Sequence, residues 1–175
     1  MRKIIIACFI AALTLGSGCQ TTSVEPVAAG PVRKIAPGAR IYIVTPRDGR
    51  YGDQQYQGSG ETVASAFDGA FSRYADSVII GSSGDDTKDI FAAAKEKQCQ
   101  YIVIPKIIHW EDRATEWSGI RDKMEIFVKV VSVETNIEVV SAYINGKSGW
   151  ATFGGDHPED LVKAPVAQFA ASLFR

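Results

Sequence analysis

The chain has 175 residues, 46% of them hydrophobic, and its 19 basic and 20 acidic side chains give a formal net charge of −1. This length is enough for one domain with a buried core. A near-neutral balance without a basic cluster argues against nucleic acid as a partner.

The first 19 residues have the order of a secretory signal. Arg2 and Lys3 carry positive charge, residues 4–15 are apolar apart from Thr14, and residues 16–18 are small. The apolar run is about a dozen residues, whereas a membrane-spanning helix needs about 20. The segment therefore predicts export and removal of residues 1–18.

Cys19 directly follows the small residues, so the segment resembles a bacterial lipoprotein signal. Such signals usually have Leu three residues before the Cys, where this chain has Gly16 and places Leu15 one residue earlier. The resemblance implies a lipidated Cys19 and a lipid membrane as partner, with three acyl chains as a firm anchor. In such lipoproteins of Gram-negative bacteria, an Asp directly after the Cys keeps the protein in the inner membrane. This chain has Gln20 at that position, which implies the outer membrane, facing the periplasm. An ordinary secretory signal and a short hydrophobic anchor are the alternatives.

The rest of the chain forms a tether and one domain. Losing Arg2 and Lys3 leaves 17 basic and 20 acidic side chains, a formal charge of −3 over 157 residues. Residues 20–37 contain three prolines and no apolar periodicity, so residues 19–37 are predicted to be a lipidated Cys and flexible tether. Residues 38–175 are predicted to be a single α/β periplasmic domain. Cys99 is its only cysteine, so it contains no disulfide, and burial as a small apolar side chain is expected for it.

The first half of this domain alternates strands with helices. β-Branched runs predict strands at 40–45, 77–81 and 101–108, and apolar side chains at helical spacing predict helices at 61–75 and 87–98. Pro105 predicts a bulge or an edge in the third strand. Strands joined through helices predict a parallel arrangement.

The second half has a different pattern. Alternating residues 123–133 and the following 137–148 predict an antiparallel hairpin with Asn136 in a left-handed turn position. Residues 113–119 are expected to continue the third strand. A last helix is predicted at 158–174, with Pro165 bending or splitting it. The predicted fold is α/β, or more loosely α+β: a single mixed sheet in the order β-α-β-α-β-β-β-α with helices mostly on one face.

Two segments differ from ordinary core sequence. Residues 109–117 and 149–160 hold both histidines and all three tryptophans of the chain. The stretches 109–119 and 147–161 resemble the uncharacterised lipoproteins of the family called domain of unknown function 4823, and the resemblance covers nearly the whole mature domain. It implies a membrane-anchored envelope protein of Gram-negative bacteria. It implies no activity and no catalytic residue.

The side chains of these segments suggest a surface for a partner or a glycan. Aromatic rings near strand ends suit such contacts, although tryptophans can also simply cover the core. The candidate surface consists of His109, Trp110, Trp117, Trp150, Asp156 and His157, joined by Tyr51 and Tyr56 of the long loop.

A metal-assisted site is the alternative for the same segments. His109 and Glu111 share one face of a strand and Asp112 faces the other way. If His157 with Asp156 and Asp160 met them, two imidazoles and several carboxylates would suit Zn²⁺. The simpler expectation makes Asp156 a helix cap and His157 a loop residue. Neither Gly-x-Ser-x-Gly nor His-Glu-x-x-His occurs, so no catalytic residue, metal or cofactor is assigned.

The sequence thus favours a non-enzymatic accessory or binding module, anchored in the outer membrane, with an envelope protein or peptidoglycan as its partner. One alternative is a metal-assisted envelope hydrolase using the His109 and His157 segments. The other is a self-assembling structural subunit, because an open sheet leaves edges that can pair.

Overall fold

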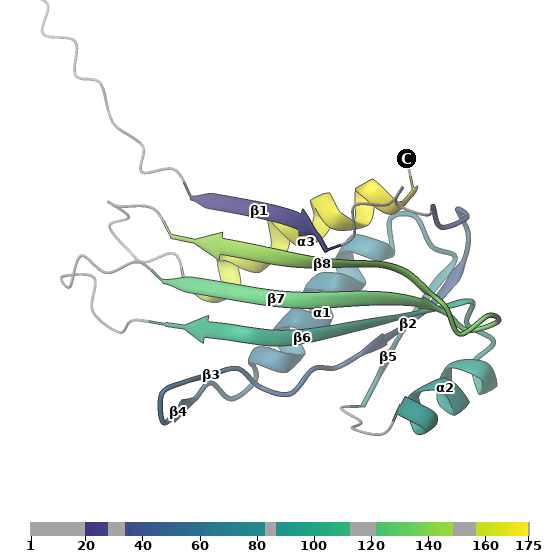
Figure 1. Ribbon diagram of the computed structural model, residues 1–175, viewed down its shortest axis with the longest axis horizontal. Coiled ribbons are helices and arrows are strands. Elements are labelled where there is room, and N and C mark those ends of the chain that lie inside the picture. Colours follow the sequence, from purple (N-terminus) through teal and green to yellow (C-terminus); the bar gives the residue numbers. More distant parts are fainter. Residues whose placement is uncertain (1–19, 28–33, 83–86, 113–121, 149–156, 175) are drawn as a thin grey trace, which may run out of the picture.

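The computed structural model describes residues 20–27, 34–82, 87–112, 122–148 and 157–174 (Figure 1). Its main feature is a six-stranded mixed sheet in the order β1-β8-β7-β6-β2-β5, which confirms the predicted fold class. The strands of this sheet are β1 (Thr21–Pro26), β2 (Arg40–Val44), β5 (Ser77–Gly81), β6 (Tyr101–Glu111), β7 (Lys123–Ser132) and β8 (Glu138–Lys147). The helices are α1 (Ser59–Phe71), α2 (Thr87–Glu96) and α3 (Pro158–Phe174).

The parallel half of the sheet follows the predicted alternation of strands and helices. β2 lies between β5 and β6 and pairs in parallel with both. Tyr42 and Ile43, neighbours on β2, belong to separate core clusters because successive side chains of a strand point to opposite faces. Both faces of this part of the sheet are therefore buried.

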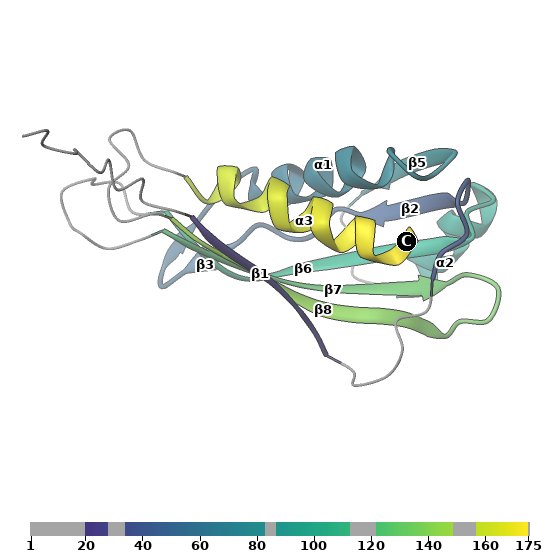
Figure 2. The ribbon, with the colours of Figure 1, turned by 90° about the horizontal axis from the view of Figure 1, so that it is seen from above.

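Helices cover the two faces unequally. α1 and α3 pack against each other and against one face, where the larger core gathers around Phe67, Phe71 and Phe169 (Figure 2). We call this side the helix face. α2 packs through Ile90 and Ala94 over β2 and β6 on the opposite side, which we call the outer face. Helices thus lie mostly on one face, as predicted.

The antiparallel half is the predicted hairpin. β7 pairs with both β6 and β8, and Asn136 in the connecting turn has a φ of 59°. Met124, Ile126, Val128 and Val130 alternate into the core, as expected for a half-buried strand.

β1 corrects the prediction of a coil over residues 20–37. Thr21–Pro26 pairs antiparallel with β8 at the edge of the sheet. Its polar sequence hid the strand, because only Val24 packs on the core. Beyond residues 28–33, Lys34 donates a hydrogen bond to the Ser172 carbonyl (2.8 Å) and Ile35 is buried. Folded structure therefore extends well into the predicted tether.

β6 is longer than predicted, and Pro105 lies at a local edge of the sheet, one of the two arrangements predicted for it. The ladder with β2 ends at Val103, so Pro105 lies where β6 pairs only with β7, and its missing N–H costs no hydrogen bond to β2. The register shift lies further along, between Ile107 and His109.

α3 runs as a single helix through Pro165. The sequence predicted that this proline would bend or split the helix, and the split is wrong. Pro165 is itself buried, and Leu161, Val166 and Leu173 hold the helix against the core. Among the described residues no helix is both long and apolar enough to cross a membrane.

The loop before α1 contains a small hairpin, β3 (Arg50–Tyr51) and β4 (Gln54–Gln55). Gly58, with a φ of 85°, is the N-cap of α1 and makes no side-chain cap hydrogen bond. The Asp48 carboxylate instead accepts a hydrogen bond from the Gly60 N–H (2.9 Å). Ser59 accepts one from the Gly49 N–H (2.8 Å), and together these bonds fix the loop to the helix start.

Candidate functional site

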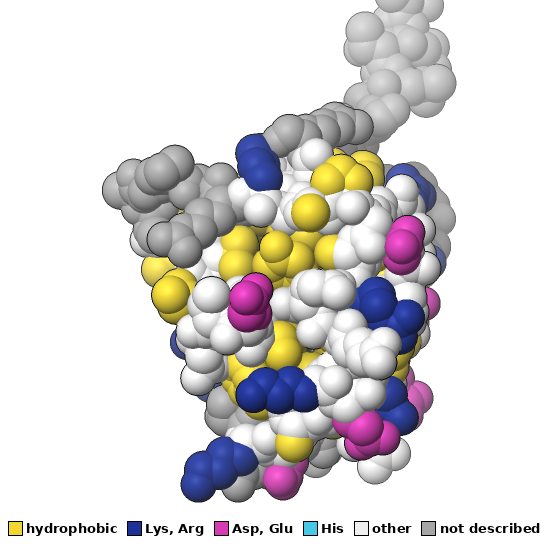
Figure 3. Space-filling view, turned by 90° about the vertical axis from the view of Figure 1, so that its right-hand side faces the viewer, with side chains coloured by type: hydrophobic (Ala, Val, Ile, Leu, Met, Phe, Trp, Pro, Cys, Tyr) yellow, Lys and Arg dark blue, Asp and Glu magenta, His cyan; other side chains and the backbone are white. Residues whose placement is uncertain are grey.

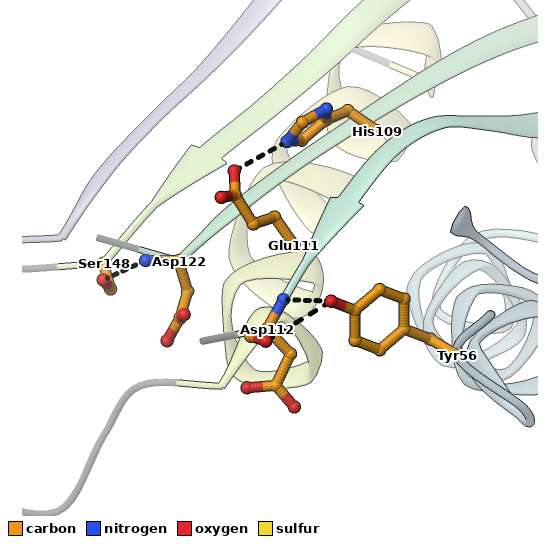
Figure 4. Close-up of polar contacts among 6 residues, drawn as sticks. All are labelled: Tyr56, His109, Glu111, Asp112, Asp122 and Ser148. Atoms are coloured by element: carbon orange, nitrogen blue, oxygen red, sulfur yellow. Dashed lines mark hydrogen bonds and ion pairs between the residues drawn. The ribbon is translucent and has the colours of Figure 1, made fainter. Parts of the chain in front are cut away.

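The end of β6 carries the residues that the sequence singled out. After the register shift, His109 pairs with Glu125 of β7, Trp110 with Met124 and Glu111 with Lys123. His109 and Glu111 therefore share one face of the strand, as predicted, and Nε2 of His109 lies 3.0 Å from the Glu111 carboxylate (Figure 4). The Glu111 side chain is 3% exposed and that of His109 is 32% exposed, so the imidazole stands between a buried carboxylate and solvent.

Tyr51 of β3 joins His109 at this site. Their rings meet edge to face with centroids 5.2 Å apart, and Tyr51 is 43% exposed. Such a contact orders both rings. This pair is the part of the predicted aromatic surface that the structure brings together.

Trp110 does not belong to that surface. It is 2% exposed and lies in the main core cluster. A side chain added at Gly49 would press on its Cβ and on Ile107, so the loop needs glycine there. The pleat explains this correction: next to an outward-facing histidine, the indole must point inward, toward the helices.

Asp112 contacts residues from two distant parts of the chain, Tyr56 and His157. Its backbone N–H and carbonyl contact the Tyr56 hydroxyl at 3.4 and 3.3 Å. Its carboxylate lies 3.3 Å from Nδ1 of His157, the residue before α3. That hydrogen bond, and then the charge of Asp112, raise the pKa of His157 above its ordinary value of 6.5. The imidazole is 61% exposed, so the pair is a solvated contact.

The two histidines thus contact different carboxylates. Figure 4 shows the Glu111 side chain reaching toward His109, whereas the backbone of Asp112 faces the Tyr56 hydroxyl and its carboxylate points away from His109. Within the described part of the chain no group of three or more potential ligands could hold a metal ion. The convergence of His109 and His157 on which the hydrolase alternative depends is therefore not seen among these residues. Trp117, Trp150 and Asp156 lie outside them.

The outer face of the antiparallel strands forms a polar and aromatic floor. One row across the sheet is Ser23, Asn145, Glu125 and His109; the next is Glu25, Tyr143, Phe127 and Lys106. The Phe127 and Tyr143 rings lie 5.0 Å apart, and the Lys129 ammonium stands 5.7 Å from the Phe127 ring. A groove of about 530 Å³ crosses this floor, lined by Ser23, Glu25, His109 and Asn145 among others.

Sequence reasoning missed this floor because its residues come from four strands that are far apart in the chain. The alternation of residues 123–133 gave the outward positions of β7. Some of the side chains in the same rows come from β1, a strand that the sequence did not predict.

Cys99 is a buried residue, as expected. It is 5% exposed, and burial raises the pKa of its thiol despite the nearby charge of Arg40. A protonated, buried thiol is a poor nucleophile.

This fold and floor define a small mixed α/β domain with a solvated sheet face. The chain belongs to the family described as Domain of unknown function (DUF4823), whose model matches residues 33–173. That confirms the resemblance seen in the sequence. The comparison with curated proteins gave no match.

Solved structures with similar folds come from several bacteria. The PelC dodecamer from Paraburkholderia phytofirmans is 15% identical, with a TM-score of 0.64 over 90% of this chain and 99% of that one. The hypothetical protein CT253 from Chlamydia trachomatis is 10% identical, with a TM-score of 0.51 over 78% and 98%. The lipoprotein GNA1162 from Neisseria meningitidis is 12% identical, with a TM-score of 0.49 over 76% and 99%. At these identities the similarity to the first two structures establishes the fold alone.

Proposed function

We propose that the chain is a lipoprotein anchored in the outer membrane through Cys19, facing the periplasm, and that it acts as a non-enzymatic accessory or binding module of the cell envelope. The observation that carries the proposal is the N-terminal order of basic residues, apolar run, small residues and Cys19. Gln20 in place of Asp supports the outer membrane. The absence of a catalytic motif in the sequence supports a binding role.

The outer face is the proposed binding surface. Phe127 and Tyr143 present half-exposed rings beside charged and amide side chains, and Tyr51 adds an exposed ring next to His109. Aromatic rings flanked by hydrogen-bonding groups suit a sugar chain such as peptidoglycan, or the polar rim of an envelope protein.

Membrane fractionation of a Cys19→Ala variant tests the anchor. Without the sulfur that takes the lipid, the protein should leave the membrane fraction. Cys99→Ala is the matched control, because that thiol is buried in the domain and should leave fractionation unchanged. If Cys19→Ala stays in the membrane fraction like the unchanged protein, the proposed anchoring is wrong.

Self-assembly is a second candidate, favoured by the PelC dodecamer, since the fold match covers 90% of this chain. β1 and β5 are the two edges of the sheet. A contact between such unlike edges of successive copies is heterologous and can close into a ring. Ile80 on β5 is 44% exposed and suits this contact.

Light scattering on detergent-purified protein tests assembly. A mass of several protomers that falls toward one protomer in Ile80→Lys is the expected result. Ile137→Lys, at an equally exposed position in the β7–β8 turn, is the control and should keep the larger mass. A single-protomer mass for the unchanged protein would exclude this candidate.

A further inference from the structure

The proposed lipidation site lies close to the sheet along the chain. Thr21, the first residue of β1, pairs with Lys147, the last residue of β8. Only Gln20 lies between Cys19 and Thr21, so these two residues are at most about 7 Å apart. A lipid on Cys19 would therefore hold this end of the sheet at the bilayer surface, whereas an 18-residue tether would let the domain move about 60 Å away.

Two lysines lie at the same end of the sheet. Lys147 pairs with Thr21 on one side and with Lys123 on the other, and both lysines are exposed. Like charges directly opposite each other destabilise a sheet. Neither forms an ion pair with a described residue, so their charge is available to an anion.

Among the described acidic side chains around this end, Glu125 and Glu25 line the same groove as the two lysines, one and two rows farther along the sheet, and the others are engaged or face away. Glu111 contacts His109, Asp112 contacts His157, and Asp122 is buried. Glu159 and Asp160 belong to α3, on the helix face. At the opposite end of the molecule, side chains of both signs are scattered over the surface (Figure 3).

We infer that the sheet end formed by Thr21, Lys123 and Lys147 rests on the membrane that holds Cys19, with the two ammonium groups binding the phosphates of lipid head groups. The inference rests on the proposed anchoring and deepens it, because it fixes the orientation of the domain. The long axis of the hairpin then points from the membrane into the periplasm, with the turn at Asn136 farthest out.

Quenching by head-group nitroxide lipids tests this orientation. The lipidated protein, in a Cys99→Ala background, is reconstituted in vesicles of phosphatidylethanolamine with a minority of phosphatidylglycerol. Fluorophores are placed at Glu125→Cys, one row from the lysines, and at Glu134→Cys, in the turn at the far end of β7. Strong quenching at position 125 and little at 134 is expected.

Charge reversal provides the second arm. A lysine near an anionic surface favours binding by roughly five-fold, so Lys123→Glu with Lys147→Glu should reduce quenching at position 125 several-fold. The control pair Lys95→Glu with Lys97→Glu changes the same charge at exposed positions at the end of α2, away from the sheet end, and should leave quenching unchanged.

The outcomes separate the inference from the anchoring. Equal quenching at the two labels, or no change on reversing Lys123 and Lys147, in protein that floats with the vesicles would overturn the orientation while leaving the anchor intact. Protein that does not float with the vesicles would overturn both.

Discussion

Two glycines of α1 differ in the space available for a side chain. A Cβ at Gly60 would overlap the Pro46 carbonyl oxygen, whereas a Cβ at Gly69, in the same helix, meets nothing within 4 Å. Gly60→Ala should lower the free energy of unfolding by about 1–3 kcal/mol through steric overlap. Gly69→Ala should raise it by about 0.5–1 kcal/mol, because glycine inside a helix costs conformational entropy.

Urea denaturation of the two variants measures this difference. Equal effects of the two substitutions would contradict the tight contact between the Pro46 carbonyl and the start of α1.

The contact between His157 and Asp112 predicts a pH dependence. Since Asp112 raises the pKa of His157, the imidazole should titrate above 6.5 in the folded protein. The stabilisation from the pair is then full below pH 6.5 and is lost as the pH rises through the folded-state pKa. NMR titration of His157 should show the raised pKa, and Asp112→Asn should lower it. An unchanged pKa in Asp112→Asn would show that the carboxylate is not its cause.

At the scale of the element, β1 is the least predictable part of the fold. The hairpin of β7 and β8, the parallel strands and all three helices follow from apolar periodicity, since each buries a face against its neighbours. β1 is an edge strand with one inward apolar residue, Val24, and its partner β8 lies about 120 residues away. No local pattern carries that pairing.

The candidate site, too, was predictable from the sequence only in part. Strand alternation correctly placed His109 and Glu111 on one face and Asp112 off it. Trp110 was misplaced because the sequence alone does not tell which side of a strand meets the helices. Tyr56 and His157 reach Asp112 from separate loops, and their meeting depends on the tertiary structure.

Val24 provides a test that β1 belongs to the domain. Val24→Ser should lower the free energy of unfolding by about 1 kcal/mol, because the half-buried valine packs on the core. Val27→Ser, at a position that is 52% exposed, should stay within about 0.5 kcal/mol of the unchanged protein. Chemical denaturation compares them, and equal values would indicate that β1 is not packed as described.

At the scale of the whole molecule, the short link between Cys19 and β1 changes what the anchor does. A long tether would let the domain search the periplasm for a partner. A sheet that begins two residues after a lipid on Cys19 would instead hold the domain in one orientation at the membrane, as we propose. In that proposed orientation the outer face, with its rings and polar rows, would be turned toward neighbouring envelope components.

The intact mass of the protein extracted from membranes tests the central claim most directly. A mass equal to residues 19–175 plus three acyl chains is the result that a lipid-anchored module predicts. A protein of unmodified mass in the soluble fraction would contradict the anchor and, with it, the orientation at the membrane.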